Sequence, residues 1–392
     1  MKYFFCLGTN QTLSIAEITS VLKESGSWQI ANEQIFILEN EAINAQDLIR
    51  RLGGTIKIGI IEKEINRHQI LKNFQNLLDL KHIQDKFKFG ISHYGRGKLN
   101  IRPLGMEVKK YLKENGKSAR WVISKEPTLS SVVVEQNKLT GKGIEFVLIS
   151  HPTNPERYFV GRTLAVQPFK ELSFRDFGRP ARDDYSGMLP PKLAQIMINL
   201  SGADYKDKIL DPFCGSGTVI MEALLMGYST VLGSDISEKA INDTKKNTEW
   251  VKDNYQLSII NYQFFKKSAT ELSDIFTQSS IGAIVTEPYL GPQRGNVNVA
   301  QTAKGLEKLY SDSLLEFRNI LKPGGRITMI WPILSSFRQQ VFLNPKLHGL
   351  KIINPIPEKI RDNRIMKLTG RSTMIYGREG QKVWREIVVL EK

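Results

Sequence analysis

Alternating strand and helix patterns in the second half of the chain constrain its fold more than any other feature. A helix over residues 192–200 precedes short apolar runs and amphipathic segments that follow one another in turn. The expected strands cover 208–210, 230–233, 259–265, 281–285 and 326–331, and the expected helices cover 219–226, 238–250 and 303–321. Such alternation is typical of a Rossmann-like parallel sheet with helices on both faces. Residues 373–376 and 383–390 predict an antiparallel hairpin at the edge of this sheet.

The loop between the first of these strands and the next helix is rich in glycine. It reads Asp211-Pro212-Phe213-Cys214-Gly215-Ser216-Gly217-Thr218. The two glycines allow a tight turn and a close approach of backbone N–H groups to a ligand. Ligands of open α/β sheets bind outside the carboxyl ends of the strands, where this loop lies. We call residues 211–218 the donor loop and expect a ligand there.

Three ligand classes can be compared at the donor loop. A phosphate-binding P-loop would need Lys and then Ser or Thr after its last glycine, whereas Thr218 and Val219 follow here. A dinucleotide fingerprint would need a third glycine where Ile220 stands. A methyltransferase loop begins with an acid that can face the ammonium group of S-adenosylmethionine, and Asp211 supplies it. We predict S-adenosylmethionine as the cofactor, with a dinucleotide site or a plain glycine turn as alternatives. The candidate contacts are Asp211, Phe213, Gly215, Gly217 and Thr218.

Two later strand ends supply further candidate contacts. Asp235 and Ile236 follow the next strand. The acid can accept hydrogens from both ribose hydroxyls, and Ile236 can flank the adenine. Ser268 and Ala269 follow the strand after that. The Ser268 hydroxyl can bind the adenine amino group or cap a helix, and the sequence leaves both open.

A second loop, which we call the acceptor loop, covers residues 286–292. It reads Thr286-Glu287-Pro288-Tyr289-Leu290-Gly291-Pro292 and follows the strand over 281–285. A loop at this strand end lies beside the donor's methyl group. Polar acceptors can hold the N–H groups of an exocyclic base amine, and an aromatic face can stack on the base. Thr286, Glu287, Pro288 and Tyr289 are therefore the candidate catalytic residues, with a proline turn and a packed Tyr as the alternative.

Charge and composition indicate the class of partner. The net charge is +15 with a pI of about 9.6, which favours a polyanion and makes nucleic acid the leading substrate class, although solubility alone is another explanation. The two cysteines and five scattered histidines predict no metal site. The chain has no signal peptide and no apolar run that could span a bilayer, so a cytoplasmic location is expected.

The first half of the chain shows a different pattern, with the order β-α-β-β-α-β near the N-terminus. This order fits a ferredoxin-like unit. We expect a ferredoxin-like domain over residues 1–65, a second α+β domain over 66–168, a linker over 169–188 and the Rossmann-like domain over 189–392.

Several stretches resemble the THUMP-domain tRNA guanosine N2-methyltransferases of the archaeal guanosine-ten type and their eukaryotic relative. They are Phe174-Arg175-Asp176-Phe177-Gly178-Arg179-Pro180, residues 187–195, the donor loop, Tyr376-Gly377-Arg378 and Trp384-Arg385-Glu386-Ile387. The resemblance implies that the second domain is a THUMP domain that grips the tRNA acceptor end. The family's acceptor motif is Asp-Pro-Pro-Tyr between Thr and Gly. Aligning Thr286 and Gly291 puts Glu287 in place of the Asp, while aligning Pro288 and Tyr289 puts Thr286 there.

We therefore expect a tRNA methyltransferase that acts on the exocyclic N2 amine of a guanosine. The target base must leave its stack to reach the acceptor loop. The alternatives are a DNA amino-methyltransferase, a tRNA-binding protein that keeps the donor pocket with little catalysis, and a small-molecule methyltransferase.

Overall fold

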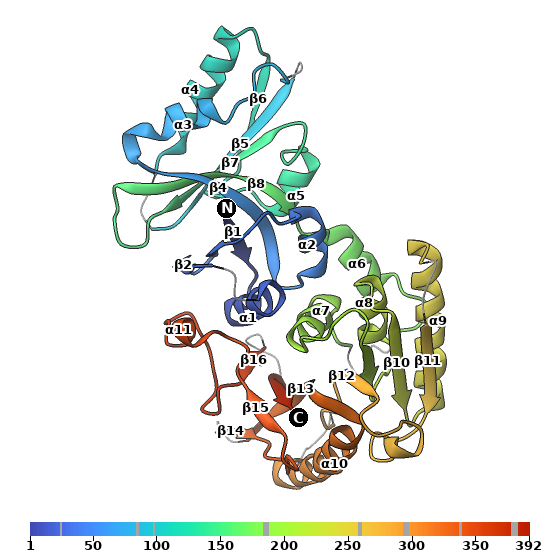
Figure 1. Cartoon of the computed structure of the whole chain (residues 1–392). Coiled ribbons are helices and arrows are strands. Elements are labelled where there is room, and N and C mark those ends of the chain that lie inside the picture. The colour runs from blue at the N-terminus through green and yellow to red at the C-terminus, as the bar shows by residue number, and fades with distance from the viewer. Residues whose placement is uncertain are drawn as a thin grey trace. The chain divides into compact units, whose positions relative to one another are not determined.

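The computed structural model describes residues 1–23, 26–83, 86–96, 99–182, 188–257, 261–292, 298–336, 339–377 and 383–392 (Figure 1). Several residues of segments singled out above lie outside this set: residues 183–187, residues 259 and 260, and Arg378. The chain divides into two compact units. The first comprises Met1–Gln11 and Glu24–Phe169, and the second comprises Thr12–Lys23 and Lys170–Lys392.

The first unit is built on an eight-stranded sheet with the order β2-β3-β1-β4-β8-β7-β5-β6. Its first four strands are β1 (Lys2–Leu7), β2 (Trp28–Asn32), β3 (Ile35–Glu39) and β4 (Thr55–Asn66). These strands pair antiparallel in the order β2-β3-β1-β4, and α2 (Ala45–Arg51) precedes β4. Both the element order and the strand order are those of a ferredoxin-like unit. The fold expected from the N-terminal pattern is therefore confirmed.

The other half of this sheet joins β4 through an antiparallel pair with β8 (Arg157–Val166). The remaining strands are β5 (Phe87–Tyr94), β6 (Ala119–Val122) and β7 (Ile144–Ser150), and β5 runs parallel to both β6 and β7. The helical segments of this part are η1 (Arg67–Gln69), α3 (Ile70–Asn76), α4 (Ile101–Glu114) and α5 (Ser131–Gln136). Residues 66–168 thus form an α+β arrangement, as expected.

The second unit contains a nine-stranded sheet. Its parallel part has the order β11-β10-β9-β12-β13, with β9 (Lys208–Asp211) at the centre. The other members are β10 (Thr230–Asp235), β11 (Asn261–Lys266), β12 (Ile281–Thr286) and β13 (Leu321–Ser336). The helices α7 (Pro191–Leu200), α8 (Thr218–Leu225), α9 (Glu238–Tyr255) and α10 (Val299–Ile320) connect the strands. The alternation seen in the sequence therefore corresponds to the expected doubly covered sheet.

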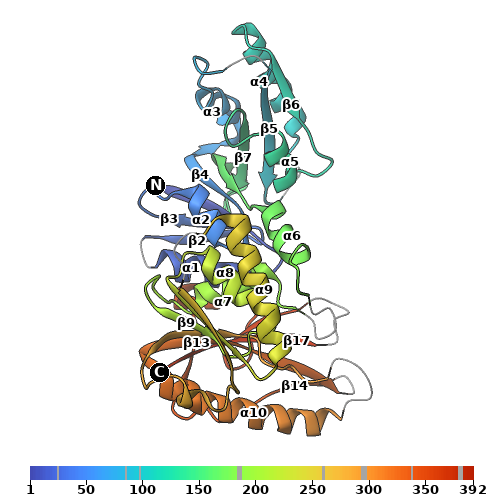
Figure 2. The ribbon, with the colours of Figure 1, turned by 90° about the vertical axis from the view of Figure 1, so that its right-hand side faces the viewer.

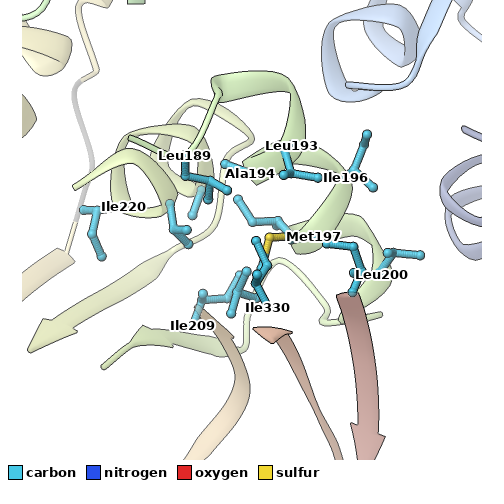
Figure 3. Close-up of a cluster of buried hydrophobic side chains, with 14 of the residues drawn as sticks. Leu189, Leu193, Ala194, Ile196, Met197, Leu200, Ile209, Ile220 and Ile330 are labelled. Atoms are coloured by element: carbon cyan, nitrogen blue, oxygen red, sulfur yellow. The ribbon is translucent and has the colours of Figure 1, made fainter. Parts of the chain in front are cut away.

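The two faces of this sheet carry separate cores, because neighbouring residues of a strand point to opposite faces. Ile209 of β9 packs with residues of α7 and α8, whereas Leu210 packs with residues of α10. Figure 2 shows α10 and the α7–α9 group on opposite sides of the strands. The close-up in Figure 3 shows the first core, in which Met197 of α7 and Ile220 of α8 lie near Ile209 and Ile330. This packing holds the carboxyl ends of β9 and β12 in place.

Helix α1 (Gln11–Leu22) belongs almost entirely to the second unit, although β1 and β2 on either side of it belong to the first. Leu13 and Ala16 are fully buried in the core that contains α7. Asn199 of α7 donates through Nδ2 to Glu17 Oε1 at 2.8 Å, and Thr12 Oγ1 accepts from the Lys367 N–H at 2.8 Å. A fragment that begins at Lys170 would lack this helix, so the contribution of the first unit to RNA binding should be tested in the full chain.

Two expectations about secondary structure are wrong. The hairpin over 373–376 and 383–390 does form, as β16 (Met374–Tyr376) and β17 (Trp384–Glu391), but β17 is not at the sheet edge. It pairs antiparallel with β13 on one side and with β15 (Lys351–Ile353) and β16 on the other. The sequence pattern missed β15, which has three residues, and also β14 (Gln339–Phe342) and α11 (Glu358–Arg361).

The second difference concerns the segment after the first unit. The chain forms helix α6 over Phe169–Phe177 where an irregular linker was expected. Only Leu172 and Arg175 are buried on this helix, so it shows little apolar periodicity. Its anchor is a buried ion pair, described below. Among the helices of the described residues, none has the length and apolar character that a membrane span requires.

Candidate functional site

The donor loop leaves the carboxyl end of β9 and opens α8 in the way the sequence predicts. Gly215 and Gly217 have φ values of +52° and +83°, in the left-handed region that favours glycine. A Cβ on Gly217 would lie 3.0 Å from Thr244 Cγ2 of α9, whereas a Cβ on Gly215 would meet only the Phe213 carbonyl at 4.0 Å. Gly217 therefore permits close packing against α9, and Gly215 leaves open space next to the turn.

Asp211 connects the donor loop with the acceptor loop. Its Oδ1 accepts a hydrogen bond from the Thr286 hydroxyl at 2.7 Å and another from the Phe213 N–H at 3.2 Å. Burial raises the pKa of this carboxyl to about 7, although both hydrogen bonds lower it, and the nearby Asp235 and Glu287 carboxylates raise it further. A cation placed at this carboxyl would favour its ionised form.

Asp235 at the end of β10 is bound to the donor loop. Its Oδ2 accepts from the Gly215 N–H at 3.1 Å, and its Oδ1 accepts from the Ser237 N–H at 2.9 Å. A carboxylate has about four lone-pair positions, so both oxygens can still accept hydrogens from a diol. Ile236 is 70% exposed, which leaves its side chain available to a flat ligand.

Ser268 and Ala269 follow β11, and Ala269 is buried. The Ser268 Oγ accepts from the Thr270 N–H at 3.2 Å, and the two hydroxyls lie 2.8 Å apart. The next helical turn, η2 (Leu272–Asp274), has Glu271 as its N-cap. Ser268 therefore closes a local turn and does not cap a helix, which removes one of its two expected roles.

Helix α9 and the segment after α6 support the donor loop from behind. Thr244 donates its hydroxyl to the Gly215 carbonyl at 2.8 Å, and Asn247 Nδ2 donates to the Ser216 carbonyl at 2.7 Å. Arg179, which is 3% exposed, donates through an Nη atom to the Thr218 hydroxyl at 2.6 Å. These side chains hold the loop in shape before any ligand binds, and sequence analysis had given them no role.

A buried ion pair attaches α6 to α8. Arg175 donates through Nε to Glu222 Oε1 at 2.6 Å and through an Nη atom to Oε2 at 3.0 Å. Gln195 of α7 also donates to Oε2 at 3.0 Å, and Arg175 reaches the Tyr255 hydroxyl of α9 at 3.2 Å. Arg175 and Arg179 both belong to the 174–180 stretch, so this stretch serves to fix the helix that begins with the donor loop.

The acceptor loop begins at the last residue of β12. Thr286 and Pro288 are buried, whereas Tyr289 is 59% exposed. A hydrogen bond from α10 fixes the backbone of Tyr289, because the Tyr310 hydroxyl donates to the Tyr289 carbonyl at 2.8 Å. Leu290 is partly buried and packs against the core that contains α7. The exposed ring of this loop is therefore that of Tyr289.

Glu287 forms an ion pair that the sequence did not reveal. Arg385 of β17 donates through Nε to Glu287 Oε1 at 2.5 Å, and the two side chains are 16% and 13% exposed. The only signal for Arg385 was its place in the 384–387 stretch. Asp211 and Thr286 are thus joined by a hydrogen bond, and Asp235 is hydrogen-bonded to the donor loop. Glu287 instead pairs with Arg385 of the last strand, β17.

Comparisons with known proteins agree with this geometry. A family model described as RMKL-like, methyltransferase domain, matches residues 179–344, which include both loops. A curated relative from Methanothermococcus thermolithotrophicus, a probable tRNA (guanine(10)-N2)-dimethyltransferase, is 30% identical over 125 residues, covering 31% of this chain and 70% of that protein. The chain belongs to the tRNA guanine-N2-methyltransferase family. The resemblance to tRNA guanine-N2-methyltransferases and the expected methyltransferase domain are therefore confirmed.

Other members of the family match a shorter share of their length. The tRNA (guanine(10)-N2)-dimethyltransferase of Methanothermobacter thermautotrophicus is 31% identical over 212 residues, which are 53% of this chain and 57% of that protein. The chain thus spans little more than half the length of this relative. TrmN from Thermus thermophilus has the same fold, with a TM-score of 0.52 and 17% identity over the whole of both chains. A second family model, described as DNA methylase, matches residues 14–246 and ends before the acceptor loop.

Proposed function

We propose that this protein transfers a methyl group from S-adenosylmethionine to the exocyclic N2 amine of a guanosine in tRNA. The observation that carries the proposal is the 2.7 Å hydrogen bond between Thr286 and Asp211, because it joins the donor loop to the acceptor loop. The guanine of tRNA as substrate is taken from the names of the relatives, and the transfer of a methyl group is inferred from the residues of the two loops. A tRNA substrate would place the protein in the cytoplasm.

The residues around the donor loop suit S-adenosylmethionine. Asp211 would face the ammonium group, and Asp235 would accept the ribose hydroxyl hydrogens. The open space at Gly215 leaves room for the ligand beside the turn. Ile236 would flank the adenine, and Ser268 with Ala269 would lie at its edge. Phe213, Gly217 and Thr218 would shape the turn around the ligand. The donor supplies an electrophilic methyl group on a positively charged sulfur.

Donor binding should strengthen as the pH rises through about 7. Burial raises the pKa of Asp211 to about 7 in the free protein, and a cationic donor favours the ionised carboxylate. The dissociation constant should therefore fall up to tenfold per pH unit below pH 7. Titration calorimetry between pH 5.5 and 7.5 measures this, in a range where the donor's own amine, with a pKa of about 8, is mainly protonated.

The matched control is Asp211→Asn, which keeps the shape of the side chain and removes its titration. This variant should bind more weakly, with an affinity that changes little over the same pH range. A wild-type affinity that does not change between pH 5.5 and 7.5 would contradict the proposed contact.

Asp235→Ala should weaken donor binding by about 1–3 kcal/mol, the scale of a hydrogen bond to a charged group. The variant also loses the bond to the Gly215 N–H, so Asp235→Asn is the control that keeps an acceptor oxygen. Calorimetry at pH 7.5 measures both variants. An affinity of Asp235→Ala equal to that of the wild type would remove Asp235 from the donor site.

The acceptor loop would bind the target guanine after the base has left its stack. Glu287 would accept a hydrogen of the N2 amine and favour the pyramidal form whose lone pair attacks. The ring of Tyr289, which is 59% exposed, would stack on the base. The new N–C bond forms as the C–S bond of the donor breaks, and the amine releases one proton to Glu287 or to water. Thr286 and Pro288 would hold the loop against Asp211.

The net charge of +15 supports an RNA substrate. Residues 66–168, which follow the ferredoxin-like domain over 1–65, are proposed as a THUMP-like RNA-binding domain, and the catalytic domain is proposed over 189–392 with α6 packed on its α8. Binding through Lys and Arg should weaken steeply as salt rises, because phosphate contacts release counterions.

The direct test is methyl transfer from labelled donor to unmodified tRNA, with duplex DNA of equal concentration as the comparison. DNA is included because one family model is that of a DNA methylase. We expect label in tRNA and none in DNA. Label in DNA alone would favour a DNA amino-methyltransferase, and tight binding of both ligands without transfer would favour a tRNA-binding protein.

A further inference from the structure

The ion pair between Arg385 and Glu287 links strand β17 to the acceptor loop, and the donor contacts proposed above do not use it. Nε of Arg385 lies 2.5 Å from Oε1 of Glu287 across 98 residues of sequence. Arg385 is held within the sheet, since β17 pairs it with Pro332 of β13 and with Tyr376 of β16. Arg385 is therefore fixed by a paired strand, and Glu287 lies at the start of a loop that leaves a strand of the same sheet.

The chemistry of this pair leaves binding capacity on both partners. An arginine has five N–H donors, and only the Nε group is used in the bond to Oε1. A carboxylate has about four acceptor positions, so one bond to Oε1 leaves room for two more hydrogens. Guanidinium and carboxylate groups also prefer planar, two-bond contacts. A flat ligand with donors beside an acceptor would complement them.

The edge of guanine has this arrangement. Its N1–H and N2–H groups are donors, and O6 beside them is an acceptor. Adenine presents a bare N1 and an amine at position six, so it would place a lone pair against the carboxylate and a donor against the guanidinium. Enzymes that extrude a base read it through such contacts on its Watson–Crick edge.

We propose that Glu287 and Arg385 together select guanine at the methylated position, with Glu287 accepting from N1–H and N2–H and Arg385 donating to O6. This inference rests on the proposed function and specifies how its site chooses the base. With the alignment that puts Glu287 in the place of the family's Asp, it also gives a reason for the change to Glu. The longer side chain can reach Arg385 and the base edge together. Arg385 further supplies a cation to a site that already holds Asp211, Asp235 and Glu287. Burial, and to a smaller extent the Asp235 and Glu287 carboxylates, raise the pKa of Asp211 to about 7.

The test uses tRNA in which the methylated guanosine, once mapped, is replaced by 6-thioguanosine. This base keeps N1–H and the N2 amine but has a weak acceptor at position six. Single-turnover rates on the two RNAs give a preference ratio. We expect the wild type to prefer guanosine by on the order of tenfold or more, as expected for loss of a good base contact. Arg385→Met should slow transfer to guanosine and bring the ratio close to one, and Arg385→Lys, which can still donate to O6, should keep part of the preference.

Arg326→Met is the matched control, because Arg326 also lies in this sheet and pairs with a glutamate, Glu391, at 2.9 Å. Its ratio should equal that of the wild type. If Arg385 only supports Glu287, Arg385→Met will slow methyl transfer to both RNAs equally and the preference ratio will not change. That result overturns the inference while the proposed function stands. A wild type that methylates both RNAs equally overturns it without any variant. A wild type that methylates no RNA overturns the proposed function and this inference together.

Discussion

Glu287→Ala is expected to slow single-turnover methyl transfer to tRNA by on the order of a hundredfold to a thousandfold, the usual effect of removing one group that stabilises a transition state. The contact with the amine hydrogens matters mainly as the nitrogen becomes pyramidal, so tRNA binding should change little. Glu287→Gln should keep partial activity, because its amide oxygen can still accept from the amine and from Arg385. Rapid-quench measurement with labelled donor gives these rates.

Neighbouring variants serve as controls for this expectation. Tyr289→Ala should also impair transfer, because its exposed ring is the one available for stacking. Leu290→Ala should mainly reduce stability, since this side chain packs against the core. If Glu287→Ala is as fast as the wild type, the chemistry depends on Thr286 and backbone carbonyls, and the alignment that puts Glu287 in the place of the family's Asp is wrong.

Arg175→Met should lower the free energy of unfolding by about 3–5 kcal/mol, the usual loss when one partner of a buried ion pair is removed. The side chains of Arg175 and Glu222 are 5% and 0% exposed, so the variant leaves a carboxylate buried without its cation. Burial already raises the pKa of Glu222, while Arg175 lowers it. Without Arg175 the acid would favour its protonated form more strongly, so the loss should shrink as the pH falls toward about 4.5, the ordinary pKa of this group.

Chemical denaturation followed by tryptophan fluorescence measures this loss, and two further variants define its cause. Lys246→Met, on an exposed lysine of α9, should change stability by less than about half a kcal/mol. Arg175→Met combined with Glu222→Gln should recover much of the loss, because the amide removes the buried charge and still accepts from Gln195. A single Arg175→Met variant as stable as the wild type would show that the pair does not anchor α6.

The parts of the fold that follow from periodicity could be predicted. The donor loop between β9 and α8, and Asp235 at the end of β10, could be predicted because glycine turns and strand ends leave local signals in the sequence. Helix α6 could not be predicted this way, since one ion pair rather than an apolar stripe fixes it. The prediction that β17 lies at the sheet edge was wrong, because β15 has only three residues and shows too little alternation of polar and apolar residues to be recognised.

Long-range pairing limits what the sequence can tell about the site. The Thr286–Asp211 bond spans 75 residues and the Arg385–Glu287 pair spans 98, and no local pattern shows which residue pairs with which. The membership of α1 in the second unit is a similar case, because its burial depends on α7 and on residues near 365 rather than on its sequence neighbours. Residue types therefore indicated the chemistry, while the structure identified the partners.

The most direct test of the central claim is mass spectrometry of nucleosides from the tRNA of a strain that lacks this gene. The account predicts that N2-methylguanosine or its dimethyl form decreases at one tRNA position, and that the wild-type gene restores it while the Glu287→Ala gene does not. An unchanged level of N2-methylated guanosine in the deletion strain, with loss of a different modification or of none, would contradict the account.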